Sequence, residues 1–474
     1  MFLDERIHLR WAWWIAHGRR LRLPFISGRG LSVYLLAAVA PESRDPLLAG
    51  RLLTVAIGLV AMVACQRLAL RATADRRVAD LAALFYVACP FTLFHDRMVL
   101  TDSFLAAFTA VTLVLSMALA EEPTLARGMR LGLAMALGVA SKTTGLVLFM
   151  VPALAVAVAG RERRRALGPL AAAYATGAAL AAYPLWLFFR RTDELSGALG
   201  VRDNESSFAG NAGANLRLAF EWLWTYWTPS LALLALAGLG YALAHRERRR
   251  AALLLAIVAV GPTVAFVAVS EIWYPRYLLF TTVPLLPLAA AGFAGIAETV
   301  HTWRSVGRRA GAALTVALLA AVLAPALAFD LALWRDPARA PFPALDRFQY
   351  VTGWPSGYGA RESMAFLRGE RARSPGGLLL VTPGPSTTAS AVRLLSNADP
   401  GLEVRYVDPA TVSDVRELAS GPSAPATYVI VSRAENVTLP AAWSSALRRA
   451  FASFKPDGAA ADEIYRACAG PACS

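Results

Sequence analysis

The sequence predicts a polytopic α-helical membrane protein that ends in a soluble α/β domain. Of its 474 residues, 57% are hydrophobic and 17% are charged, and the mean hydropathy is +0.47. A soluble protein of this size is normally less apolar and more charged. Long apolar segments separated by basic clusters fill the chain to about residue 334, and alternating strand and helix patterns follow.

Ten apolar segments approach the length of about 20 residues that a membrane-spanning helix needs. They lie at 47–66, 78–94, 101–119, 130–141, 144–160, 167–189, 229–244, 251–270, 277–297 and 311–333. Segment 1–46 differs, because WAWWIAHGRRLRL joins tryptophans to arginines, as helices in the interface plane do. Nothing before Asp4 anchors this segment, so we expect either that a preceding helix has been lost or that the native chain starts upstream of Met1.

The arginines that contribute to the net charge of +14 gather in clusters between alternate apolar segments, which argues against a nucleic-acid partner. The clusters are Arg67, Arg71, Arg76 and Arg77; Arg127 and Arg130; RERRR at 161–165; HRERRR at 245–250; and HTWRSVGRR at 301–309. By the positive-inside rule these five loops are cytoplasmic. The remaining loops then face outward: 1–46, 95–101, 141–143, 190–228, 271–276 and everything after about 334.

The segment 130–160 is too short for two full crossings. Its 31 residues give about 46 Å of helix, whereas two crossings of the hydrocarbon core need about 60 Å. We therefore expect Lys142, at the tip, to lie below the outer surface and to face an aqueous or anion-binding cavity. Snorkelling to the lipid headgroups is the ordinary alternative for a lysine near a helix end.

After about residue 334 the pattern is that of a small α/β domain, so the predicted domains are 1–334 and 335–474. Strands are expected at 376–384, 402–408 and 426–433, and helices at 360–373, 387–396 and 441–452. Of the four cysteines, only Cys468 and Cys473 are placed to pair, in an oxidising compartment. Aromatic residues at 222–227, WLWTYW, are expected to anchor the outer loop at the interface.

Acidic and basic residues meet in the predicted outward loops. Asp4 and Glu5 lie in the first loop, and they are either solvated carboxylates or site residues, with only one pointing into a site because neighbouring side chains on a helix diverge. Asp102 opens the segment 101–119, where capping the helix and lining a site are compatible roles. Further ionisable groups follow at 95–97 and at Glu271.

Arginines on the outward side are unusual, because the positive-inside rule disfavours them. Arg97 and Arg276 are therefore candidate phosphate ligands, since the planar guanidinium binds oxygens in pairs. Tyr274 beside Arg276 is either part of an interfacial aromatic belt or part of the same site. No cofactor is assigned; if a divalent metal binds, Asp102 and His95 are its candidate ligands, although no ligand spacing supports it.

The segments LDERIHL at 3–9, RMVLTDSFLAAF at 97–108, LGLAMALGVASKTTGLVLF at 131–149 and YPRYLLFTTVPLLPLAAAG at 274–292 together resemble the GT-C class of lipid-linked glycosyltransferases. The likeness is to the branch of protein O-mannosyltransferases and the aminoarabinose transferase of lipid A. It covers the whole membrane region, about 330 residues. Family members carry a membrane helix before the acidic motif, which this chain does not.

The resemblance implies a hexosyl- or pentosyltransferase that moves a sugar from a polyprenyl-phosphate carrier to an acceptor hydroxyl with inversion. Asp4 or Glu5 matches the acidic residue that acts as base, Asp102 the second-loop acid, and Lys142 and Arg276 the positions near the carrier phosphate. The expected location is the bacterial cell membrane, with the C-terminal domain outside. A transporter or lipid flippase, or a scaffold presenting the C-terminal domain, are the alternative functions.

Overall fold

The computed structural model describes residues 2–160, 162–190, 211–270, 273–302, 307–384, 386–396, 399, 401–412, 414–419, 425–435 and 437–468. These residues form two compact units. The helical unit comprises Trp14–Val39 and Gly50–Pro343, and the mixed unit comprises Met1–Trp13, Ala40–Ala49 and Ala344–Ser474. The chain therefore has the predicted polytopic helical membrane fold with a C-terminal α/β domain.

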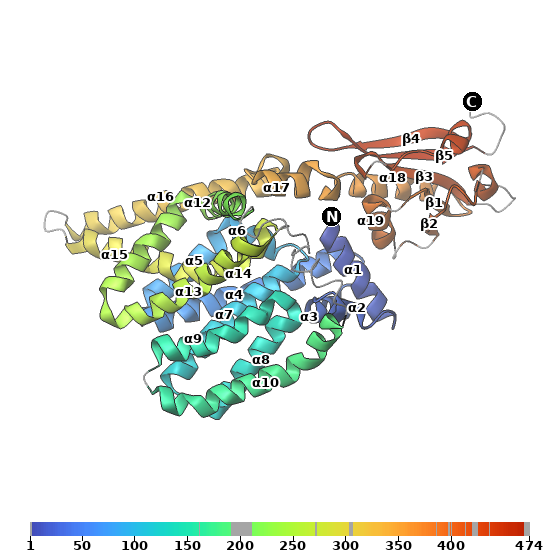
Figure 1. Cartoon of the computed structure of the whole chain (residues 1–474). Helices are drawn as coiled ribbons and strands as arrows, with labels where there is room; N and C mark the ends of the chain where they lie inside the picture. The colour runs from blue at the N-terminus through green and yellow to red at the C-terminus, as the bar shows by residue number, and fades with distance from the viewer. Residues whose placement is uncertain are drawn as a thin grey trace. The chain divides into compact units, whose positions relative to one another are not determined.

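Helices account for nearly all of the helical unit (Figure 1). The short helices α1 (Leu3–Ala16, begun in the mixed unit), α2 (Leu23–Ile26) and α3 (Gly30–Val39) come first. Then follow α4 (Pro46–Thr73), α5 (Arg76–Ala88), α6 (Pro90–Asp96), α7 (Thr101–Glu121), α8 (Leu125–Ser141), the 3-10 helix η1 (Thr143–Phe149) and α9 (Met150–Ala159). The last are α10 (Arg163–Phe189), α12 (Ala212–Ala244), α13 (Arg246–Val269), η2 (Pro275–Leu278), α14 (Leu279–Thr282), α15 (Leu285–Thr302), α16 (Arg308–Arg335) and η3 (Pro337–Arg339).

All ten predicted apolar segments lie in helices. Among the described residues, six helices are long and apolar enough to cross a membrane singly, namely α4, α7, α10, α12, α13 and α16. Two bent pairs, α5 with α6 and η2–α14 with α15, raise that number to eight. The remaining two segments form the predicted short hairpin, in which α8 has 17 residues and α9 has 10.

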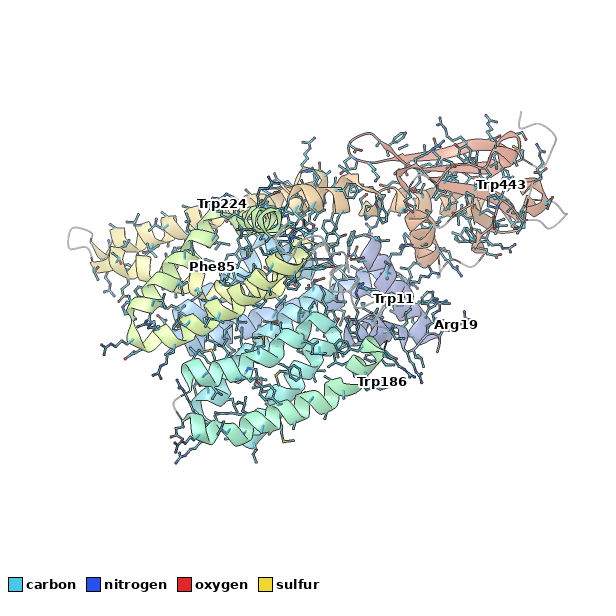
Figure 2. The ribbon with its side chains drawn as sticks, viewed as in Figure 1. Trp11, Arg19, Phe85, Trp186, Trp224 and Trp443 are labelled. Atoms are coloured by element: carbon cyan, nitrogen blue, oxygen red, sulfur yellow. The ribbon has the colours of Figure 1, made fainter. Side chains whose placement is uncertain are left out.

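Two prolines, Pro90 and Pro229, coincide with breaks in the helices. The bend of 61° between α5 and α6 falls at Cys89, which precedes Pro90 and takes an extended conformation. Thr228 has a φ of 56° before Pro229, so α12 is kinked at that point. Trp222 and Trp227 before this kink are helical and buried, not interfacial as expected. Trp224, which Figure 2 labels, lies between them on the same helix and is 41% exposed.

The mixed unit is built on a five-stranded sheet with the order β2-β1-β3-β5-β4. Its strands are β1 (Leu378–Thr382), β2 (Leu402–Tyr406), β3 (Ala426–Ser432), β4 (Leu447–Phe454) and β5 (Ala460–Ala467). Strand β1 pairs in parallel with β2 and β3, and β5 pairs antiparallel with β3 and β4. The other elements are α17 (Ala344–Arg347), the π-helix η4 (Phe348–Thr352), η5 (Trp354–Ser356), α18 (Ala360–Ala372), α19 (Thr387–Leu395), η6 (Val415–Ala419), η7 (Arg433–Glu435) and η8 (Ala441–Ala446).

Both faces of the sheet are covered at its central strands β1 and β3, as their continuous apolar sequences require. Leu378 and Leu380 of β1 point to α18 and α19, while Leu379 and Val381 point to the opposite face and its fully buried Trp443 (Figure 2). The three predicted strands and the helices at 360–373 and 387–396 are confirmed.

The helix predicted at 441–452 is wrong. Residues Ala441–Ala446 form a 3-10 helix, and Leu447–Phe454 is strand β4, which turns into β5. The turn between them is Lys455-Pro456-Asp457-Gly458, with a φ of 84° at Gly458. A Pro-Asp-Gly sequence is a strong turn signal, and it outweighs the helical pattern before it because strand pairing with β5 completes the sheet.

Candidate functional site

The segment between α6 and α7, which leads into Asp102, is held by hydrogen bonds from α5 and α7. Tyr86 on α5 donates its hydroxyl to Oδ2 of Asp96 at 2.7 Å, and both side chains are buried. Ser103 on α7 donates to the carbonyl oxygen of His95 at 3.2 Å. Residues 95–103 thus connect α6 to the first turn of α7, where Asp102 lies, in a fixed conformation.

Asp102 and Lys142 form a buried ion pair. The Lys142 ammonium donates to Oδ1 of Asp102 at 2.5 Å, and the two side chains are 14% and 6% exposed. Lys142 is the single extended residue between α8 and η1, with φ −156° and ψ 131°. The hairpin tip therefore directs this lysine onto the start of α7, which an uninterrupted helix would not do.

Arg276 completes the charged cluster from a third direction. It lies in the short 3-10 helix η2, and its Nε is 3.9 Å from Oδ2 of Asp102. Its guanidinium carbon is 4.4 Å from the ring centroid of Tyr274, while the Lys142 ammonium lies 4.1 Å from that of Tyr277. Aromatic faces stabilise cations by their quadrupoles, so the two tyrosines help to hold two like charges close together.

The balance of charge in this cluster is positive. One carboxylate stands against two cations, and Arg29 on the helical unit also acts electrostatically on Lys142. An arrangement of buried cations in excess over carboxylates is suited to an anionic ligand. We refer to Asp102, Lys142, Arg276, Tyr274 and Tyr277 as the charged cluster.

A segment that the sequence analysis did not single out supports the hairpin tip. Thr143 donates its backbone N–H to the carbonyl oxygen of Gly28 at 3.0 Å. Gly28 has a φ of 71°, and a Cβ added there would lie 2.4 Å from Oγ1 of Thr143. The turn between α2 and α3 thus needs glycine at this position to approach the tip. The signal in the sequence is Ser-Gly-Arg-Gly at 27–30.

The other predicted residues lie in different surroundings. The guanidinium of Arg97 is 5.8 Å from the ring centroid of Phe94 and interacts electrostatically with Asp330 on α16. Glu271 lies outside the described residues. Cys468 is disulfide-bonded, and Cys473 also lies outside the described residues.

The donor set around Asp102 does not fit a divalent metal. Its two carboxylate oxygens face the cations of Lys142 and Arg276, whose charges would repel a metal ion. The His95 ring is enclosed by Phe91, Phe94 and Tyr226, and its Nδ1 lies 2.9 Å from the Phe91 carbonyl oxygen. Among the described residues there is no group of three His, Cys, Asp or Glu side chains arranged to bind a metal.

Asp4 and Glu5 begin α1 and belong to the mixed unit. Glu5 is fully buried, and its Oε2 accepts the backbone N–H of Phe2 at 2.9 Å. Asp4 is half-buried and interacts electrostatically with Arg6. The two carboxylates therefore differ in burial: Glu5 is fully buried and Asp4 is half-buried.

Comparison with known proteins gives a family match and a fold match. Residues 31–188, which include Asp102 and Lys142, match the family described as dolichyl-phosphate-mannose-protein mannosyltransferase. Two crystal structures of ArnT from Cupriavidus metallidurans, one in the apo state and one bound to undecaprenyl phosphate, are similar at a TM-score of 0.50 and 16% sequence identity. The matches cover 90% of this chain and 84% and 85% of those chains. No curated protein sequence matches this chain.

These matches confirm the resemblance to GT-C glycosyltransferases. The family match is confined to the segment from α3 to α10, and the structural match extends over most of both units. The fold is therefore that of a GT-C membrane glycosyltransferase.

Proposed function

We propose that this chain is an inverting glycosyltransferase that moves a hexosyl or pentosyl unit from a polyprenyl-phosphate carrier to an acceptor hydroxyl at the outer face of a bacterial cell membrane. The observation that carries the proposal is the buried contact of Asp102 with both Lys142 and Arg276. It is a net positive site, suited to a phosphate, in a chain with a GT-C fold. The fold match to an ArnT structure containing undecaprenyl phosphate supports a polyprenyl carrier.

The cations are assigned to the leaving group. When the bond between the anomeric carbon and the phosphate oxygen breaks, the electron pair stays on that oxygen, and the carrier phosphate gains a negative charge. Groups that bind this charge more strongly than the starting phosphodiester accelerate the reaction. Asp102 accepts from Lys142, whose ammonium carries three N–H donors, and so orients it without occupying the whole group.

The base is assigned to the first turn of α1. A carboxylate removes the proton of the acceptor hydroxyl as its oxygen attacks the anomeric carbon from the face opposite the phosphate, which inverts the configuration. Of the two candidates, we assign this role to Asp4, because it is half-buried and can be reached from outside. Glu5 is fully buried and accepts from the backbone of Phe2, so it is assigned to fixing the start of the helix.

The same proposal gives the chain an orientation. The clusters at 161–165 and 245–250 are placed in the cytoplasm by the positive-inside rule, and the C-terminal domain is placed outside. A polyprenyl-linked sugar then reaches the charged cluster laterally from the bilayer.

A transfer assay in detergent tests the proposal. Purified full-length protein is mixed with a radiolabelled polyprenyl-phosphate sugar and with membranes of a deletion strain as the acceptor source, and the labelled product is identified by mass spectrometry. Wild type should transfer the sugar and release polyprenyl phosphate. The variant Asp4→Asn should lose about 100-fold or more of the rate, as expected for a general base, and Glu5→Gln less.

The alternative of a transporter or flippase gives the opposite result. Such a protein moves its ligand only across a sealed membrane, so it shows no chemistry in detergent. Unchanged transfer by a variant carrying both Asp4→Asn and Glu5→Gln would reject the assignment of the base.

A further inference from the structure

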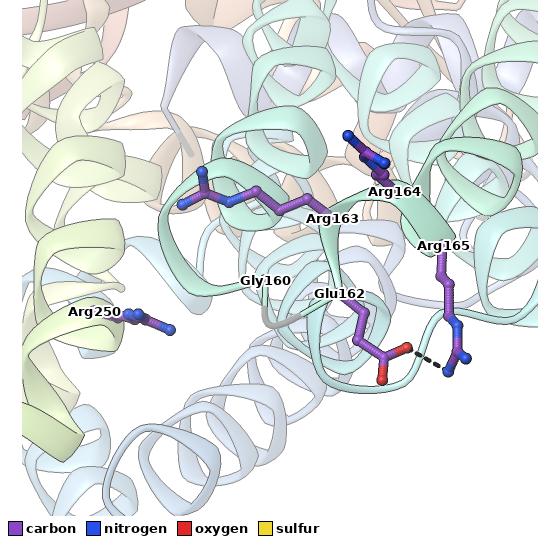
Figure 3. A pocket seen from close by; sticks show the side chains of 6 residues that line it. All are labelled: Gly160, Glu162, Arg163, Arg164, Arg165 and Arg250. Carbon is purple, nitrogen blue, oxygen red and sulfur yellow. Dashed lines mark hydrogen bonds and ion pairs between the residues drawn. The ribbon is translucent and has the colours of Figure 1, made fainter.

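A second positively charged feature lies away from the charged cluster. Gly160, Glu162, Arg163, Arg164, Arg165 and Arg250 line an open cavity of about 610 Å³ (Figure 3). Glu162 accepts from Arg165 at 2.7 Å, so one arginine is paired within the cavity. Four arginines against one glutamate leave the lining with a net charge of +3.

Two basic clusters that are about 80 residues apart in the sequence meet at this cavity. Arg163, Arg164 and Arg165 form the first turn of α10, and Arg250 lies in the first turns of α13. The helices next to them, α9 and α13, pack through a shared apolar cluster that includes Val151, Ala155, Leu254 and Val258. The charged cavity is thus at the end of a tightly packed apolar contact.

The helix surfaces that continue from the arginines are apolar and exposed. Leu167, one turn after Arg163 on α10, is 62% exposed, and Ile257, two turns after Arg250 on α13, is 43% exposed. Residues three, four and seven positions apart share a face of a helix. A cation at the helix end followed by exposed aliphatic residues on the same face is suited to a ligand with an anionic head and a hydrocarbon tail.

The cavity is distinct from the site assigned to the carrier phosphate. Helix α13 runs from Arg246, near the cavity, to Val269, shortly before the turn that carries Arg276. Its 24 residues span about 36 Å. The two positive features therefore lie at opposite ends of the helical unit, about one bilayer thickness apart.

We propose that the cavity binds the phosphodiester headgroup of an anionic phospholipid of the leaflet opposite the charged cluster. The guanidinium groups of Arg163, Arg164 and Arg250 contact the phosphate oxygens, for which their planar forks are well matched. The acyl chains lie along the faces of α10 and α13 that carry Leu167 and Ile257. A bound lipid therefore bridges the first turns of α10 and α13.

Binding to the delipidated full-length protein tests this proposal. Phosphatidylglycerol is titrated into the detergent-purified protein, and the bound lipid is counted by native mass spectrometry. Arg163→Gln with Arg250→Gln should weaken binding about 10- to 100-fold, the loss expected for charge-assisted hydrogen bonds. The control Arg308→Gln with Arg309→Gln removes the same charge from the exposed start of α16 and should leave the affinity within about twofold of wild type.

The remaining arms identify the ligand. Phosphatidylcholine, which carries no net charge, should bind wild type only weakly. Its affinity should be no higher than that of phosphatidylglycerol for the Arg163→Gln, Arg250→Gln variant. Arg163→Lys with Arg250→Lys keeps the charge, and an intermediate affinity of this variant shows that the guanidinium fork matters in a correctly folded protein. Equal losses in the α16 control, or equally strong competition by inorganic phosphate, would overturn the assignment to a lipid. Neither result bears on the transfer assay.

Discussion

The Lys142 ammonium and the Asp102 carboxylate, 40 residues apart in the chain, form an ion pair of 2.5 Å in a buried position. Breaking one side of such a pair leaves a buried charge without its partner, which is more costly than removing both sides. Substituting Asp102 or Lys142 alone should therefore have a different effect from substituting both.

Asp102→Asn and Lys142→Met should each lower kcat/KM for transfer by about 100-fold, the order expected when an electrostatic group at the reacting centre is removed. The double variant should lose no more than about tenfold beyond either single variant, because the two residues act as one unit. The losses are measured from the transfer kinetics of wild type, the two single variants and the double variant. Glu121→Gln is the control, since it breaks the exposed Arg71–Glu121 ion pair and should stay near wild type. Fully additive losses would show that the pair is not a unit.

Tyr86 holds Asp96, the last residue of α6, from which the chain leads through a short loop to Asp102 in the first turn of α7. Tyr86→Phe removes the hydroxyl that donates to the buried Asp96 carboxylate. The free energy of unfolding should fall by about 1–3 kcal/mol, because the carboxylate oxygen is left without this donor. The substitution alters the loop and leaves the contacts with the phosphate in place. The main effect should therefore be a lower kcat, with a smaller rise in the KM for the sugar donor. Tyr241→Phe removes a similar hydroxyl–carboxylate hydrogen bond on an exposed surface and should change neither constant. An effect of Tyr86→Phe on KM alone would contradict the positioning role.

Glycines allow α12 and α15 to cross at close range. A Cβ at Gly238 would lie 1.8 Å from the backbone oxygen of Leu288, whereas nothing lies within 4 Å of one at Gly240, two residues further on the same helix. Gly238→Ala should therefore destabilise the protein by about 1–3 kcal/mol, and Gly240→Ala should stabilise it by about 0.5–1 kcal/mol through helix propensity. Thermal unfolding in detergent measures both, and equal midpoints would show that the crossing is looser than described.

Burial raises the pKa of Asp462 in β5 from 3.8 to about 6, opposed by hydrogen bonds from Thr388, Ser432 and Ser453. The folded state therefore holds this proton more tightly than the unfolded chain. Local stability should be greatest below about pH 4 and fall as the pH rises through 6, by on the order of 3 kcal/mol. Amide hydrogen exchange in β3 and β5, corrected for the intrinsic exchange rate, measures this change in local stability with pH. Asp462→Asn should remove the slope, and a slope that persists in this variant would assign it to another group.

The sequence predicts the helices well because membrane crossing imposes a strong and local pattern. All ten apolar segments are helical, and the prolines at 90 and 229 mark the breaks. Prediction from the sequence fails where a partner far away in the chain decides the structure. Leu447–Phe454 is a strand because β5 pairs with it. Trp222 is buried against Trp273, and their ring centroids are 4.8 Å apart.

For the candidate site, the sequence identifies the residue types and predicts that they share one side of the membrane, but it does not give their contacts. Asp102, Lys142 and Arg276 could be selected because charges are costly in apolar surroundings. That Asp102 contacts both cations, and that Gly28 supports the hairpin tip, depends on tertiary packing between segments far apart in the chain. The meeting of the clusters at 161–165 and 245–250 in one cavity could not be predicted for the same reason.

The most direct test of the central claim is whether the charged cluster binds the phosphate of a polyprenyl carrier. The affinity of purified wild type for a polyprenyl phosphate is compared with that for the matching polyprenol, which lacks the phosphate. We predict that the phosphate strengthens binding at least about tenfold, as charge-assisted hydrogen bonds do. This advantage should be lost in Lys142→Met and in Arg276→Met but kept in the Arg163→Gln, Arg250→Gln variant. Equal affinity for the two lipids, or a full advantage in Lys142→Met, would contradict it.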